Sequence, residues 1–251
     1  MLEYIQEFLN TPYLWFLFIL CGIFIGLAKT GLSGAGLMIV PIMANIFGGK
    51  LSVGIVLPML IFADVFAVYY YHRHANWRYI ILSIPWALIG VVIATIFGNE
   101  INDIEFKNTL AIVILVAIVL LFWQDFRKKT DKLLDNWWFA GILGLAGGFT
   151  TMIGNAAGPI MSLYLLSMHL PKNNYIGTSA WFFLIINVIK VPFHIFSWNT
   201  ITVKTLTIDL FGIPAILAGV FIGIKLVKLF PEKIYRYFIL ISTCLAAFFL
   251  L

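Results

Sequence analysis

Apolar runs separated by short polar segments make up almost the whole chain. Six of these runs are uninterrupted, and they cover residues 51–71, 78–98, 107–123, 174–197, 203–227 and 233–251. Each has close to the length that an α-helix needs to cross a bilayer, about 20 residues. The runs lack the period-two alternation of a membrane β-barrel, and lipid tolerates only helices or closed barrels as spanning structures. The pattern therefore predicts an all-α, polytopic membrane protein.

Two further apolar stretches, residues 13–47 and 137–169, are interrupted by small and polar residues at matching places. The first interruption reads GLAKTGLSGAG over residues 26–36, and the second reads GGFTTMIGNAAG over residues 147–158. Because glycine favours unusual backbone conformations over regular helix, neither stretch is expected to be one continuous helix. Counting both stretches gives about eight transmembrane helices. Broken helices in corresponding positions of two halves are typical of the binding site of a secondary transporter.

The two halves of the chain follow one plan. Single residues match at nearly constant spacing: Gly36 with Gly158, Lys50 with Lys172, Gly54 with Gly177, and Asp64 with Asn187. A longer match pairs IPWALIGVVI at residues 84–93 with IPAILAGVFI at residues 213–222. We therefore expect two duplicated four-helix units, in each of which the first helix is broken. An even number of spans in each unit favours repeats of the same orientation.

Charge marks the junction between the two units. The first repeat is expected at residues 1–125 and the second at residues 137–251, joined by a linker at residues 126–136 that is rich in lysine and arginine. The positive-inside rule places this basic linker in the cytoplasm.

Composition agrees with a protein embedded in the lipid bilayer. Of 251 residues, 62% are hydrophobic and 11% are charged, and the mean hydropathy is +1.02. In soluble domains about 25% of residues are charged. The net charge of +5 comes mostly from connecting segments, where it reflects membrane topology. We therefore expect no nucleic acid among the partners.

Three charged residues lie deep in apolar sequence and are the strongest candidates for chemistry. Lys29 adjoins the first interruption, and Lys190 and Asp64 lie within apolar runs. A lysine at the centre of a membrane helix costs about 2.5 to 3.5 kcal/mol, so it usually faces a cavity, a partner or a substrate path. Both lysines suit an anionic substrate, although each also has the alternatives of pairing with Asp64 or reaching the membrane interface. Asp64 is either a proton-coupling carboxylate or the counter-ion of a lysine.

The interruptions themselves offer hydrogen-bond donors for an anion. A half-helix that restarts at Gly36 or Gly158 has free N–H groups and a partial positive charge at its first turn. The alternative is that the small residues only let helices pack closely. The substrate-binding candidates are Lys29, Ser33, Gly34, Gly36, Thr151, Gly154, Asn155, Gly158 and Lys190. His194 joins Asp64 as a proton-coupling candidate, with a place at the membrane interface as its alternative.

An intramembrane serine protease is a competing interpretation of the first interruption. Residues 31–34 read GLSG, which fits the Gly-x-Ser-Gly pattern of rhomboid proteases, and His169 or His194 would be the base. The second interruption has no serine beside Gly154, although a protease needs only one. A helix break that is repeated without the serine favours transport over catalysis. We expect no enzyme, no cofactor and no metal. A passive anion channel is the stronger alternative, because sequence does not distinguish a pore from alternating access.

The sequence around both interruptions resembles the sulfite exporter TauE/SafE family, also called TSUP, of bacterial membrane permeases. The resemblance rests on GLSGAGLMIVP at residues 31–41 and IGNAAGP at residues 153–159. The chain departs from the family's run of glycines at Ala35, and again at residues 155–157. The resemblance implies proton-coupled export of sulfite, sulfoacetate or related organosulfonates across the inner membrane. Rocking of the two halves around one bound anion would give alternating access.

Overall fold

The computed structural model describes residues 2–32, 36–102, 104–106, 108, 109, 112, 116, 137–229 and 231. Within these residues the chain is helical and contains no strand, as predicted. The α-helices are α1 (Leu2–Phe8), α2 (Pro12–Lys29), α3 (Gly36–Phe47), α4 (Gly49–Tyr71), α5 (Trp77–Glu100), α7 (Trp137–Gly154), α8 (Gly158–Ser167), α9 (Lys172–Pro192) and α10 (Val203–Leu229). A short 3-10 turn, η2 (His72–His74), follows α4, and a π-helical turn, η3 (Phe193–Ser197), follows α9.

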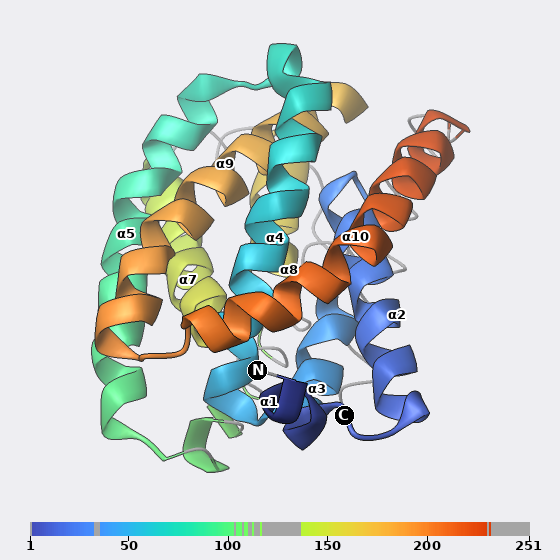
Figure 1. The fold of residues 1–251 in the computed structure, drawn as a ribbon. Helices are drawn as coiled ribbons and strands as arrows, with labels where there is room; N and C mark the ends of the chain where they lie inside the picture. Colours follow the sequence, from blue (N-terminus) through green and yellow to red (C-terminus); the bar gives the residue numbers. More distant parts are fainter. Residues whose placement is uncertain are drawn as a thin grey trace.

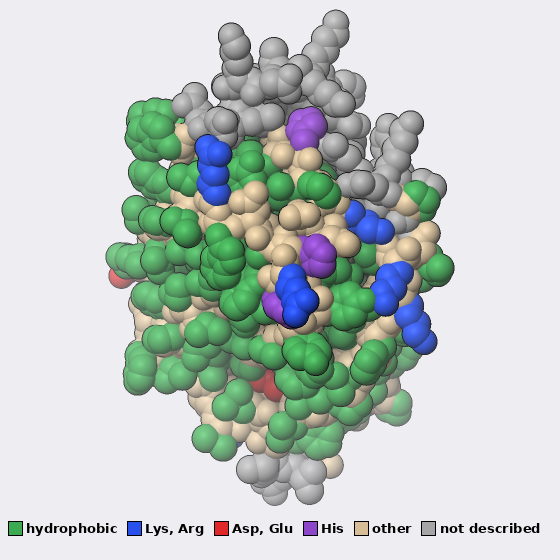
Figure 2. Space-filling model, turned by 90° about the horizontal axis from the view of Figure 1, so that it is seen from above, with side chains coloured by type: hydrophobic (Ala, Val, Ile, Leu, Met, Phe, Trp, Pro, Cys, Tyr) green, Lys and Arg blue, Asp and Glu red, His purple; other side chains and the backbone are tan. Residues whose placement is uncertain are grey.

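Six helices among the described residues are long and apolar enough to cross a membrane. Four of the predicted runs coincide with α4, α5, α9 and α10. The runs at 107–123 and 233–251 and the linker at 126–136 lie largely outside the described residues, so the total of eight stays a prediction. Large hydrophobic side chains point outward, with Leu210 63% and Phe221 62% exposed, and hydrophobic side chains cover much of the face shown in Figure 2. Such a surface fits lipid better than water.

Both predicted interruptions break their helices. Helix α2 ends at Lys29 and α3 begins at Gly36, whereas α7 ends at Gly154 and α8 begins at Gly158. Backbone torsions of the left-handed region stop the leading helices, with φ of 121° at Gly31 and 54° at Asn155. Helices α3 and α8 contain 12 and 10 residues. At a rise of about 1.5 Å per residue, each is too short to cross a hydrocarbon core of about 30 Å.

The leading helix of each half packs against the last described helix of the other half. A Cβ atom at Gly26 of α2 would collide with the carbonyl oxygen of Ile216 in α10, and one at Gly148 of α7 would collide with that of Ala87 in α5. Gly26 and Gly148 lie ten residues before Gly36 and Gly158, and Ala87 and Ile216 are matched in the two IP segments. The same backbone contact is therefore made twice, and only glycine permits it.

Helices α4 and α9 pack against each other between these two helix pairs. In Figure 1, α5 and α7 lie on one side of α4 and α2 lies on the other, while α10 crosses in front of α4. The arrangement brings the ends of both broken helices to the middle of the protein, beside the charged residues of α4 and α9.

Candidate functional site

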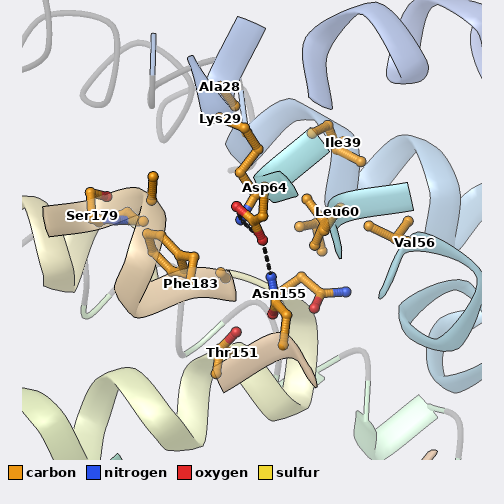
Figure 3. Close-up of a pocket in the computed structure, with 17 residues that line it drawn as sticks. Ala28, Lys29, Ile39, Val56, Leu60, Asp64, Thr151, Asn155, Ser179 and Phe183 are labelled. Carbon is orange, nitrogen blue, oxygen red and sulfur yellow. Dashed lines mark hydrogen bonds and ion pairs between the residues drawn. The ribbon is translucent and has the colours of Figure 1, made fainter. Parts of the chain in front are cut away.

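A cavity lies where the two helix breaks meet α4 and α9 (Figure 3). Its space for the centres of water molecules is about 60 Å³, whereas one water needs about 10 to 15 Å³ by the same measure. The cavity therefore has room for several waters or one small ligand. Hydrophobic side chains make up much of its wall, and its polar lining residues are Lys29, Asp64, Thr151, Asn155, Ser179 and Asn187.

An ion pair forms one side of the cavity. The Nζ atom of Lys29, at the end of α2, lies 2.9 Å from Oδ1 and 3.1 Å from Oδ2 of Asp64 in α4. Asn187 of α9 donates from Nδ2 to the same Oδ2 at 2.7 Å. Asp64 is fully buried, whereas 11% of the Lys29 side chain is exposed. The carboxylate is thus held from two helices, and the lysine retains access to the cavity.

The second buried lysine has a different environment. Lys190 of α9 is fully buried, and its Nζ donates to three oxygen atoms. These are Thr151 O at 2.9 Å, Thr151 Oγ1 at 3.0 Å and Asn155 Oδ1 at 2.7 Å. The Asn155 amide also donates from Nδ2 to the carbonyl of Val53 in α4 at 3.1 Å. Lys190 therefore joins α9 to the end of α7, and Asn155 extends the connection to α4.

Both half-helices begin at the cavity. Gly36, the first residue of α3, and Gly158, the first residue of α8, belong to its lining. Figure 3 shows Lys29 and Asp64 on one side of the cavity and Thr151 and Asn155 on another. The site thus combines a cation, two helix starts and neutral donors around one small space.

A family model for the sulfite exporter TauE/SafE matches residues 18–250, which include both helix breaks and the residues around the cavity. The chain belongs to the sulfite exporter TauE/SafE family. No curated protein and no solved structure matches the chain. TauE/SafE proteins are membrane transporters, in agreement with the apolar helices, and the family is not one of enzymes.

The TauE/SafE fold of this chain brings most of the candidates together. Of the predicted site residues, Lys29, Gly36, Asp64, Thr151, Asn155 and Gly158 line the cavity. Lys190 does not line the cavity, but it bonds to Thr151 and Asn155, which do. Ser33 and Gly34 lie outside the described residues. Of the two pairings that sequence left open for Asp64, its pairing with Lys29 is present in the structure.

His194 lies apart from the cavity lining. Its ring is buried against Trp198, and Nδ1 lies 2.8 Å from Thr200 Oγ1. Gly154 ends α7 next to Asn155 and is buried. The roles of His194 and Gly154 stay predictions.

Asn187 is a site residue that the sequence reasoning missed. It contacts Asp64 and lines the cavity, yet it attracted notice only as the match of Asp64 in the other half. The available signal was an amide in the apolar run 174–197. A polar side chain in a membrane helix usually faces a partner or a cavity.

Proposed function

We propose that this TauE/SafE protein exports small sulfur-containing anions, such as sulfite, sulfoacetate or other organosulfonates, across the inner membrane of a bacterial cell. The observation that carries the proposal is the cavity, which is lined by Lys29 together with Gly36 and Gly158, the first residues of α3 and α8. Alternating access, in which the two halves rock around one bound anion, is the proposed mechanism.

The chemistry of the lining supports an oxyanion. Helix starts present free backbone N–H groups and a partial positive charge, which together attract anions. Lys29 adds a charged donor, and charge-assisted hydrogen bonds to oxyanions are stronger than neutral ones. Sulfite and sulfonates present several oxygens in a small volume, so one such group can meet donors from several sides of the cavity.

Asp64 is the proposed link between the anion and a proton. The Asp64 carboxylate forms an ion pair with the Lys29 ammonium. An entering anion would therefore compete with Asp64 for the same donor. Protonation of Asp64 would release Lys29 to the anion, and loss of that proton would restore the ion pair and expel the anion. Transport of the anion would thereby be coupled to proton movement. His194 is a second candidate in the proton path, because its Nε2 is buried without a partner among the described residues.

Transport by purified protein in lipid vesicles tests this proposal. We expect a proton gradient to drive sulfite or sulfoacetate movement against its concentration gradient. Lys29→Met should abolish that movement, whereas Lys204→Met, which removes an exposed lysine of α10, should leave it intact. Downhill movement alone would establish the anion channel instead. Transport of carboxylates but of no sulfur oxyanion would contradict the substrate class.

A further inference from the structure

We infer that the two broken helices are hairpins that enter the membrane from opposite faces, and that each one is the gate of the cavity toward its own face. The hairpin α2–α3 is the gate toward the outside of the cell, and the hairpin α7–α8 is the gate toward the cytoplasm. The inference rests on the proposed function, because it assigns the two gates that alternating access requires.

The first broken helix turns back on itself. A Cβ atom at Gly36, the start of α3, would lie 3.4 Å from Ala28 Cβ near the end of α2. At the other end of α3, the Phe47 ring lies 5.3 Å from the ring of Phe8, which precedes α2. Helix α3 therefore runs antiparallel to α2 and returns to the face from which α2 starts.

The second broken helix has the same form. A Cβ atom at Gly147 of α7 would lie 3.8 Å from Ile160, near the start of α8. Farther along α8, the Tyr164 ring lies 6.3 Å from the ring of Phe139 at the start of α7. Helix α8 therefore also returns to the face from which its leading helix starts.

Helices α4 and α9 show that the two halves have opposite orientations. These helices follow the hairpins in their halves, and they pack against each other. Gly54, near the start of α4, leaves no room for a Cβ atom beside Thr200, which follows the end of α9. Its match in the second half, Gly177, lies near the start of α9 and leaves no such room beside the carbonyl oxygen of Tyr71 at the end of α4. The two matched helices are therefore antiparallel.

A pseudo-two-fold axis passes through the site. Asp64 and Asn187 occupy matched positions, and they bond to each other at 2.7 Å, as residues beside such an axis do. Because α4 and α9 are antiparallel, the axis runs across them, in the plane of the membrane, which is the symmetry of inverted repeats. The sequence favours repeats of the same orientation only if each broken helix counts as one crossing. A hairpin that returns to its own face leaves an odd number of crossings, and hence inverted repeats.

Charge identifies the two faces. Tyr164 of α8 donates to the carbonyl of Tyr79 near the start of α5 at 3.3 Å, so the base of α7–α8 lies at the end of the protein where α4 ends. Figure 2 is a view onto this end, where lysine and arginine side chains gather. Glu7, Glu100 and Glu105 lie at the opposite end, with the base of α2–α3. The helix ends around the base of α7–α8 carry five cations: Arg73, Arg78, Lys172, Lys225 and Lys228. The positive-inside rule places this end in the cytoplasm.

Each hairpin lies between the cavity and its own face. At the inner ends of the hairpins, Gly36 and Gly158 line the cavity. At their bases the aromatic side chains of Phe18, Phe47 and Tyr164 are buried. Movement of α2–α3 away from α4 and α9 would therefore open the cavity to the outside, and movement of α7–α8 would open it to the cytoplasm.

The bound anion acts on the outward gate. Lys29, at the inner end of α2–α3, bonds to Asp64 of α4. An anion that takes over Lys29 breaks this tie between the hairpin and α4. An anion that has entered past α7–α8 thereby loosens the exit ahead of it.

Labelling of single cysteines tests the orientation of the halves. In a chain with Cys21→Ala and Cys244→Ala, the substitutions His74→Cys and Asn199→Cys each place one thiol at an exposed position, the first between α4 and α5 and the second between α9 and α10. A membrane-impermeant maleimide should label Asn199→Cys in intact spheroplasts and His74→Cys only after the membrane is permeabilised. Labelling of both from the same face would mean repeats of the same orientation and would overturn the inference.

Loosening one hairpin at a time tests the gates. Ser179→Cys places a thiol in the cavity lining, and a charged, membrane-impermeant thiol reagent is applied from either face. Phe47→Leu should raise the rate of modification from the outside about fivefold, because the smaller side chain weakens the packing at the base of α2–α3. Tyr164→Leu should raise the rate from the cytoplasm by a similar factor. Phe211→Leu is the matched control, since Phe211 is an exposed residue of α10, and it should change neither rate.

Equal changes from both faces, or no change in either variant, would overturn the gating role of the hairpins. Neither experiment requires a substrate, so the result is independent of the proposed function. Loss of transport for every sulfur anion together with the expected labelling would contradict the substrate class and leave the gates in place. If a leucine variant does not fold, labelling between α4 and α5 and between α9 and α10 still decides the orientation on which the gates depend.

Discussion

In each half of the molecule a residue at the helix break contacts the long helix that follows, but the lysine and its acceptor change places. Lys29 and Thr151 both lie seven residues before the glycine that starts the next short helix. In the first half the lysine is at the break and its acceptor, Asp64, is on α4. In the second half the acceptor, Thr151, is at the break and the lysine, Lys190, is on α9.

The exchange gives the two lysines different roles. Lys29 is partly exposed and forms an ion pair with Asp64, so it can exchange its bond to Asp64 for a bond to an anion. Lys190 is fully buried and bonds only to neutral oxygens, so it stays in place and shapes the second break. One half therefore supplies a lysine that can change partners and the other a fixed one. Together with the repeated glycine contacts, this correspondence supports the duplicated four-helix plan, which we retain as a proposal.

Lys190→Met should have the largest effect on stability. Methionine preserves the unbranched shape but leaves the oxygens of Thr151 and Asn155 without their donor. We expect a loss of about 3 kcal/mol in the free energy of unfolding, since each of the three lost hydrogen bonds is worth about 1 kcal/mol. Thermal unfolding in detergent, with Lys204→Met as reference, measures this loss.

Lys29→Met should be the milder change in the same assay. The carboxyl group that it leaves behind can take up a proton, whereas carbonyl oxygens cannot. If Lys29→Met destabilises the protein more than Lys190→Met does, the assignment of the fixed role to Lys190 is wrong.

Asp64→Asn should act mainly on anion binding. The substitution keeps the size of the side chain but removes its charge, so Lys29 is freed and the site gains one unit of positive charge. We expect sulfate to bind about tenfold more tightly than to the unaltered protein, which corresponds to about 1.4 kcal/mol. Transport should lose its response to a proton gradient.

The control for this experiment is Asp209→Asn, a buried aspartate of α10 that does not line the cavity. It should leave sulfate affinity unchanged. Equal sulfate affinity in Asp64→Asn and the unaltered protein would mean that Asp64 does not compete with the anion.

The helices and the breaks could be predicted because they depend on local sequence. Apolar runs of the right length predicted α4, α5, α9 and α10, and glycines beside polar residues predicted the ends of α2 and α7. The expected restart at Gly36 and Gly158 is confirmed.

The pairing of side chains could not be predicted, because it depends on packing between distant segments. Lys29 and Asp64 are 35 residues apart, and Asn187 and Asp64 are 123 apart. From the sequence alone, either lysine could therefore form an ion pair with Asp64. Lys29 reaches Asp64 because α2 packs against α4, whereas Lys190 of α9 reaches Thr151 near the end of α7.

The smallest predicted effect is the difference between alanine and glycine at Asn155, which separates the cost of the backbone conformation from the loss of contacts. Asn155 and Asn199 share a left-handed backbone, with φ of 54° and 53°, but only Asn155 bonds to Lys190. At both positions alanine should cost about 1 kcal/mol more than glycine, because a Cβ atom disfavours this conformation. Glycine itself should be almost neutral at exposed Asn199. At Asn155 glycine should still destabilise the protein by about 2 kcal/mol, through the lost bonds to Lys190 and Val53. Thermal unfolding of the four variants measures both quantities. A neutral Asn155→Gly would show that Lys190 holds the second break through Thr151 alone.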